Sequence, residues 1–339
     1  FWLKPRRSPA RRPGRPGSAG RGPGPARGME GADACGPPLE LEALSGWLRA
    51  SLEGRQACDA RGFVAENLGT IMRWRLLTVL GPEGRGPGSW EAAREWLLSQ
   101  TEALDVFLSS GDVEKGRWKE ALQLLYDIVT EDPEATTGVR LRLAVAVALT
   151  FTAPTRAFEI FSDSSPVDAM ARYFAFCVWL ESGELYPTFR ELTAWQMRYV
   201  VGCWAQDDEL FWLRENIGPS CTRPTVGHTA VKLVPYRDRN AQGVSCQDQK
   251  AYYGGRRITP QLLKEVGAVC GGISKFSSAA CQAFGVPAMP IGQPGHCAFV
   301  WQVDQGRWEL GNNCGGWGGS GQHAGVHITW GRQAWLAPL

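Results

Sequence analysis

Residues 269–288 read Val-Cys-Gly-Gly-Ile-Ser-Lys-Phe-Ser-Ser-Ala-Ala-Cys-Gln-Ala-Phe-Gly-Val-Pro-Ala, and this stretch decides the expected fold. It predicts a buried helix that begins at Cys270 and is ended by Gly285. Val286-Pro287-Ala288 then leads into a strand. The thiol of Cys270 is therefore expected at a helix N-terminus, where free backbone N–H groups and the helix dipole favour the thiolate.

A histidine follows this helix at the start of a second predicted strand. Gly295-His296 precedes the apolar run Cys297-Ala298-Phe299-Val300-Trp301, and a further strand is expected at 308–310. A thiol at a helix start, followed by an imidazole at a strand start, is typical of a cysteine nucleophile with its general base. Cys270 and His296 are the candidates for these two roles.

Residues 269–313 resemble the core of the transglutaminase-like superfamily, a branch of the papain-like cysteine enzymes, and resemble most its uncharacterised plant and algal proteins. In addition to Cys270 at the helix start, Gly285-Val286-Pro287-Ala288 matches the turn of that family. His296 matches its base, and Cys297 stands where the family usually has alanine. Trp308-Glu309-Leu310-Gly311-Asn312 places Asn312 at the position of the family's aspartate.

The resemblance implies a catalytic triad of Cys270, His296 and Asn312 that performs acyl transfer or amide hydrolysis on protein or peptide substrates. An asparagine can accept the imidazole N–H and orient the ring, although it stabilises an imidazolium less than a carboxylate does. The family's aspartate shortly after the nucleophile is missing, because Gly272 and Ile273 occupy that region. Two alternatives stay open: an inactive transglutaminase-like binding module, and an interaction protein that works through its helical region.

The rest of the chain suggests an α+β protein with three parts. Residues 1–28 form a basic segment expected to be disordered, residues 29–218 a helical region, and residues 219–339 the papain-like core, in which the nucleophile helix packs on an antiparallel sheet. Apolar spacing of three and four predicts the main helices, and alternation or apolar runs predict the further strands. These helices are 40–52, 90–107, 118–131, 138–151, 167–181, 192–204, 207–216 and 261–266, and these strands are 225–236 and 326–330.

Charge is distributed unevenly along the 339 residues. Residues 1–28 carry eight Lys and Arg and no Asp or Glu, which leaves 28 basic against 34 acidic residues in the remainder. The mildly acidic body argues against nucleic acid as a partner. The basic segment is interpreted first as translated leader sequence, with a transit peptide or a basic binding tail as the alternatives.

No apolar run approaches the roughly 20 residues that a membrane-spanning helix needs. The ten cysteines lie at least 11 positions apart, mostly in apolar runs, which favours reduced thiols and a cytoplasmic protein. A plastid location is the alternative if residues 1–28 are a transit peptide.

Two further motifs lack the neighbouring sequence that their function requires, so no cofactor or metal is expected. Residues 316–321 spell G-x-G-x-x-G, but no helix is predicted after them, as dinucleotide binding requires. Cys297, Cys314, His323 and His327 are metal-ligand types, but no Cys-x-x-Cys pair accompanies them. His323 and His327 also rival His296 as the base, although the family pattern has no partner at their positions.

Overall fold

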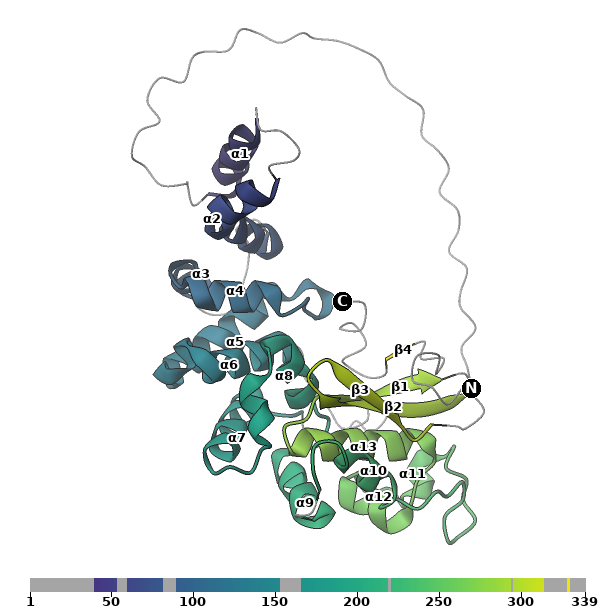
Figure 1. Ribbon diagram of the computed structural model, residues 1–339. Coiled ribbons are helices and arrows are strands. Elements are labelled where there is room, and N and C mark those ends of the chain that lie inside the picture. Colours follow the sequence, from purple (N-terminus) through teal and green to yellow (C-terminus); the bar gives the residue numbers. More distant parts are fainter. Residues whose placement is uncertain are drawn as a thin grey trace, which may run out of the picture. The chain divides into compact units, whose positions relative to one another are not determined.

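A computed structural model describes residues 40–53, 60–81, 90–152, 166–218, 221–293, 295–313 and 328–329 (Figure 1). The predictions made for residues 1–28, for the G-x-G-x-x-G motif at 316–321, and for Cys314, His323 and His327 lie outside these ranges. Within them the protein is mostly helical with one small antiparallel sheet, so the α+β expectation is confirmed at this general level.

The first part of the chain is helical, as predicted. The long helix expected from Trp90 to Phe107 breaks at Gln100, whose backbone is extended. The helix Ala60–Leu80 was not predicted individually. The helices are α1 Leu41–Leu52, α2 Ala60–Leu80, α3 Trp90–Ser99, α4 Thr101–Ser109, α5 Trp118–Glu131, α6 Gly138–Thr150, α7 Ala169–Glu181, α8 Ala194–Val201 and α9 Asp207–Ile217, with short 3₁₀ turns η2 Glu114–Gly116, η3 Pro133–Thr136 and η4 Pro187–Glu191.

Two fully buried arginines join the ends of these helices. Arg198 on α8 donates to the carbonyl oxygens of Ser110 (2.8 Å) and Leu149 (3.0 Å). Arg172 on α7 donates to the Val201 carbonyl (2.7 Å) and forms an ion pair with Asp207. The last carbonyls of a helix lack intrahelical partners, so buried guanidinium groups satisfy them while holding the helices together.

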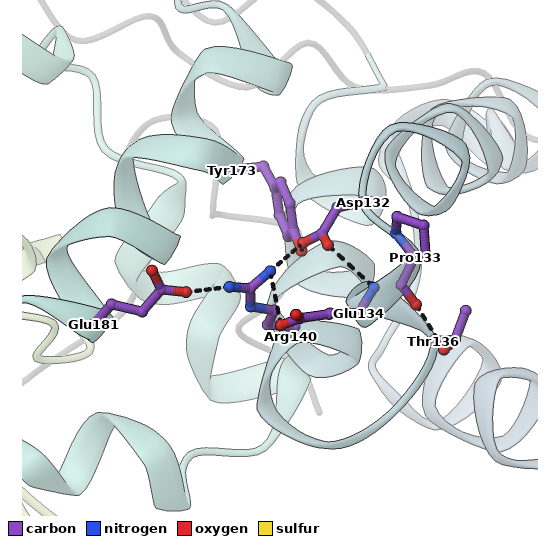
Figure 2. A network of polar contacts seen from close by, with 7 residues as sticks. All are labelled: Asp132, Pro133, Glu134, Thr136, Arg140, Tyr173 and Glu181. Carbon is purple, nitrogen blue, oxygen red and sulfur yellow. Dashed lines mark hydrogen bonds and ion pairs between the residues drawn. The ribbon is translucent and has the colours of Figure 1, made fainter.

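A polar network fixes the turn between α5 and α6 against α7, as Figure 2 shows. The Asp132 carboxylate accepts from the Tyr173 hydroxyl (2.6 Å) and from Arg140 (2.8 Å), and Arg140 also pairs with Glu181 and Glu134. Burial raises the pKa of Asp132, but the hydrogen bonds and the Arg140 charge outweigh it and leave this pKa below its usual value. The buried carboxylate is thus ionised and structural.

The second part of the chain adds four helices and the sheet. The helices are α10 Val226–Val231, α11 Gln249–Tyr252, α12 Pro260–Val266 and α13 Cys270–Ala283. The prediction of a strand over residues 225–236 is wrong, because α10 occupies this region. Val226 and Ala230, four residues apart, are both completely buried on one helical face, and α10 packs against α13. A six-residue apolar pattern is ambiguous between helix and strand, and tertiary packing decided it.

The sheet contains β1 Ala288–Gln293, β2 His296–Asp304, β3 Arg307–Gly311 and β4 Ile328–Thr329 in the order β3-β2-β1-β4, with every pair antiparallel. The strands predicted after Pro287, from His296 and around Trp308 are therefore confirmed. The strand expected at 326–330 is present at its two described residues. Helix α13 packs on β1 and β2, with α10, α11 and α12 on the same side of the sheet (Figure 1).

Helix α13 ends as the sequence predicted. Gly285 has a φ of 77°, its N–H donates to the Gln282 carbonyl (2.9 Å), and the Val286 N–H reaches back to the Cys281 carbonyl (3.0 Å). This pair of bonds is a Schellman motif, which favours glycine because of the positive φ. The chain is thereby reversed into β1.

The helical region supports α13 directly. The buried Gln282 side chain donates to the carbonyl oxygens of Tyr199 on α8 (2.7 Å) and Ala288 on β1 (2.8 Å). Helices α8 and α9 both contact α13, and the described residues from Glu40 onward belong to one compact unit. The helix that carries Cys270 is therefore held from both parts of the chain.

Gly227 provides a test of how α10 packs on the sheet. A Cβ at this position would lie 2.7 Å from the Trp301 ring, which is completely buried. We expect Gly227→Ala to lower the free energy of unfolding by about 1–3 kcal/mol because the core is overpacked. Urea unfolding followed by circular dichroism measures this change.

Gly69→Ala is the matched control, since Gly69 is an exposed helical glycine on α2, and a Cβ added there would have no neighbouring atom within 4 Å. At this position alanine is expected to stabilise by about 0.5–1 kcal/mol through helix propensity. Equal effects of the two substitutions would contradict the described packing of Gly227 against Trp301.

Candidate active site

Cys270 is the first residue of α13, as predicted. Its N-cap Val269 has an extended backbone and no side chain caps the helix, so the first N–H groups are directed at the space around the thiol. The residues just before α13 pack closely against Gly272. A Cβ added to Gly272 would lie only 2.4 Å from the Cβ of Ala268, so the position favours glycine. Cys270 itself is half-buried.

The surroundings of Cys270 favour its thiolate. The largest influence is a hydrogen bond from the Cys297 thiol; N–H groups of Cys297 and Gly271 also donate, and the charge of His296 acts in the same direction. Burial opposes these effects, yet together they lower the pKa of Cys270 to about 5. The neighbouring Cys297, as the donor beside this anion, has its pKa raised. One negative charge is thus held on Cys270.

Other thiols in the described part of the chain have the opposite character. Burial raises the pKa of Cys177 to about 11 and that of Cys203 to about 12, and it also raises the pKa of Cys281 on α13. These cysteines behave as small apolar residues. The low pKa of Cys270 therefore comes from its position and not from a general property of the fold.

His296 begins β2, and its ring is oriented by a backbone carbonyl. The Nε2 atom lies 2.5 Å from the carbonyl oxygen of Asn312. Since a carbonyl oxygen only accepts, Nε2 carries the proton, and Nδ1 is the acceptor of the neutral ring. The structure places this ring close enough to Cys270 for its charge to act on the thiol.

The contact between Asn312 and His296 differs from the predicted one. Its backbone carbonyl, and not its side chain, accepts from the His296 ring. The side-chain Nδ2 instead lies 3.0 Å from the Cys270 carbonyl, 2.9 Å from the Ser274 hydroxyl and 3.0 Å from the Cys297 carbonyl. Asn312 also has a positive φ of 52°, a conformation that asparagine tolerates better than most residues. All three predicted site residues are thus brought together.

Three residues of this site were not predicted from the sequence to take part in it. Ser274 is fully buried and donates to the Cys297 carbonyl (3.0 Å), and its position four residues after Cys270 was the available signal. Gln293 pairs with His296 in the β1–β2 register and donates to Asn313 Oδ1 (2.9 Å). Cys297 was noted only as a substitution for alanine, although it is the largest influence that lowers the pKa of Cys270.

The second histidine in the described ranges, His228, has other partners. Its Nε2 lies 3.0 Å from Glu309 Oε2, and its ring meets the Trp301 ring edge-on at 4.9 Å. Within the same ranges, no group of three or more His, Cys, Asp or Glu side chains is arranged to hold a metal ion. A search of these residues also finds no helix with the length and apolar character to cross a membrane.

Comparisons with known proteins yield no match: no family model, no curated protein and no solved structure is similar to this chain at a significant level. The site is therefore interpreted from its own geometry.

Rates of alkylation test the thiolate. We expect the reaction of Cys270 with iodoacetamide to follow a titration with its midpoint near pH 5, the pKa that its hydrogen bonds and His296 produce. Replacing His296 by glutamine removes one of the influences that lower the pKa of Cys270, so the midpoint should move to higher pH by about one pH unit. Mass spectrometry of the alkylated peptide measures both profiles, with buried Cys281 as the slow internal control. A Cys270 midpoint near 9 in the unsubstituted protein would contradict this assignment.

The identity of residue 312 gives a second test. The two N–H groups of the Asn312 amide are shared by two carbonyl oxygens and a hydroxyl. A carboxylate at this position has no N–H group to donate to these oxygens. We expect Asn312→Asp to lower the free energy of unfolding by about 1–3 kcal/mol at neutral pH. Chemical denaturation provides the measurement.

Asn313→Asp is the matched control, because the Asn313 side chain accepts from Gln293 through Oδ1, and a carboxylate oxygen accepts equally well. This substitution is expected to change stability by less than about 0.5 kcal/mol. If both substitutions are neutral, the side chain of Asn312 does not join α13 to β2 as described.

Proposed function

We propose that this protein is a cysteine-dependent enzyme that performs acyl transfer or amide hydrolysis on protein or peptide substrates. The observation that carries the proposal is the position of Cys270 at the start of α13, where Asn312 contacts both Cys270 and His296 and the surroundings lower the pKa of the thiol to about 5. A nucleophile that is ionised at neutral pH, with a base whose tautomer is fixed, is the arrangement that covalent catalysis requires.

We also propose that residues 219–339 form a transglutaminase-like, papain-like core. The order of its elements supports this: a helix begins at the cysteine, a Gly-Val-Pro-Ala turn follows, and antiparallel strands begin at His296 and Arg307. The proposal assigns the roles of nucleophile to Cys270, base to His296, and positioning residue to Asn312.

The proposed reaction begins with attack of the Cys270 thiolate on a carboxamide carbon. As the C–S bond forms, the carbonyl electron pair moves onto oxygen, and the N–H of Cys270 at the helix N-terminus stabilises the resulting oxyanion. Protonated His296 gives its Nδ1 proton to the leaving amine, and a thioester remains. Neutral Nδ1 then takes a proton from water or from an amine as it attacks, and the thiolate leaves.

In this reaction Asn312 acts through its neighbours. Its carbonyl holds the His296 ring with Nδ1 as the acceptor, and its side chain keeps Cys270 beside Cys297. This arrangement accounts for asparagine in place of the family's aspartate, because the position needs an N–H donor as well as an acceptor.

An activated ester tests the proposal without knowledge of the natural substrate. We expect p-nitrophenyl acetate to release one equivalent of nitrophenol in a burst and to leave an acetyl group on Cys270, detected by peptide mass mapping. Cys270→Ser should abolish this burst, and His296→Gln should slow it by about 10²–10⁴-fold at pH 7. Adding a primary alkylamine distinguishes the outcomes, since amide product indicates transfer and free acetate indicates hydrolysis.

Cys281→Ser is the matched control, because Cys281 lies on the same helix but is fully buried. The burst of this variant should equal that of the unsubstituted protein. Rapid alkylation of Cys270 without any acetylation would favour the binding module over an enzyme. Slow and equal alkylation of all thiols would contradict the proposal. It would favour the alternative of an interaction protein that works through its helical region.

A further inference from the structure

The neighbour of the proposed nucleophile is itself a thiol. Cys297 is 3% exposed, and it lies near enough to Cys270 to be the largest influence that lowers the pKa of the Cys270 thiol. An alanine at this position would pack as well and would lack the S–H donor, so the thiol adds chemistry that packing does not need.

Hydrogen bonds hold the two cysteines together independently of their sulfurs. Asn312 Nδ2 lies 3.0 Å from the carbonyl oxygen of each cysteine, so these two oxygens are at most about 6 Å apart. Ser274, one turn along α13 from Cys270, donates to the Cys297 carbonyl at 3.0 Å. Disulfides join residues whose Cα atoms are about 4.4–6.8 Å apart, and the shared Asn312 amide keeps the backbones of these two cysteines close to one another.

We propose that Cys270 and Cys297 are a redox pair: a hydroperoxide oxidises Cys270, and Cys297 resolves the product into a reversible disulfide that switches the site off. This modification does not depend on acyl transfer, since an inactive scaffold with the same two thiols would also undergo it. For an enzyme, the disulfide removes the nucleophile until a dithiol restores it.

The chemistry takes place in two balanced steps. The Cys270 thiolate attacks the distal oxygen of the hydroperoxide; an S–O bond forms, the O–O bond breaks, and the alkoxide or hydroxide that leaves takes a proton from water. The Cys270 sulfur loses two electrons and becomes a sulfenic acid. The Cys297 sulfur then attacks it, its proton and the S–OH group leave as water, and an S–S bond remains.

The two thiols suit these different roles. Cys270 is half-buried and meets the hydroperoxide, whereas Cys297 is shielded from direct oxidation or alkylation. A resolving thiol in contact protects a sulfenic acid from irreversible oxidation to the sulfinic acid. Cys246 is the competing partner, because it is partly buried and within electrostatic range of Cys270.

Peroxide treatment of the full-length chain, followed by blocking of free thiols and non-reducing peptide mapping, tests this pair. Trypsin releases Cys270 within 265–275, but Cys281 and Cys297 share the peptide 276–307, so a second cleavage after Phe284 is needed to separate them. We expect a Cys270–Cys297 cross-link, 2 Da lighter than the two thiols, that dithiothreitol reverses. Labelling of Cys270 should fall at least tenfold on oxidation and return after reduction.

Two variants identify the resolving cysteine. In Cys297→Ala, peroxide should convert Cys270 to the sulfinic acid, and dithiothreitol should not restore its labelling; in Cys246→Ser, the cross-link should form as before. A Cys270–Cys246 cross-link, or sulfinic acid at Cys270 in the unsubstituted protein with Cys297 still free, would overturn the proposal. Because the readout is a bond and not turnover, a protein that fails the ester test but forms this disulfide would refute only the proposed enzyme activity.

Discussion

The site depends on one side-chain amide, that of Asn312, which joins the start of α13 to the start of β2. Its Nδ2 reaches the carbonyl oxygens of Cys270 and Cys297 and the hydroxyl of Ser274. An amide nitrogen has two hydrogens, so these three acceptors share two donors in a half-buried setting where an unmade hydrogen bond is costly. The same residue uses its carbonyl to orient His296. Cys270, His296 and Cys297 are therefore placed by one residue with an unusual backbone conformation.

This placement favours ionisation of one of the two thiols over the other. Two neighbouring thiols cannot both ionise readily, and the helix N-terminus, the Gly271 N–H and His296 all favour the charge on Cys270. The pKa of Cys297 is raised beside this charge, so Cys297 keeps its proton. The proposed nucleophilic attack and the proposed disulfide both draw on this difference between the two thiols.

The helical region contributes rigidity more than chemistry in the part of the chain that the structure describes. Gln282 ties α13 to α8 and β1, and buried Arg198 ties α8 to the ends of α4 and α6. Each of these bonds satisfies a backbone carbonyl that helix or strand pairing leaves available. Support of this kind keeps the first turn of α13 in place, and the proposed catalysis would require such a preorganised site.

The sequence by itself determined the elements whose signals are local. Gly285 ends α13 because a positive φ favours glycine, and the apolar run after His296 forms β2 because β-branched and aromatic residues suit a buried strand. Cys270 and His296 lie at the starts of α13 and β2, as the sequence predicted, and their catalytic roles stay a prediction. Only the tertiary structure decided that residues 226–231 form a helix, since six residues satisfy either period until Trp301 packs against Gly227. It also decided that Asn312 joins the backbones of Cys270 and Cys297, because hydrogen bonds between segments tens of residues apart leave no trace in the local pattern of either segment.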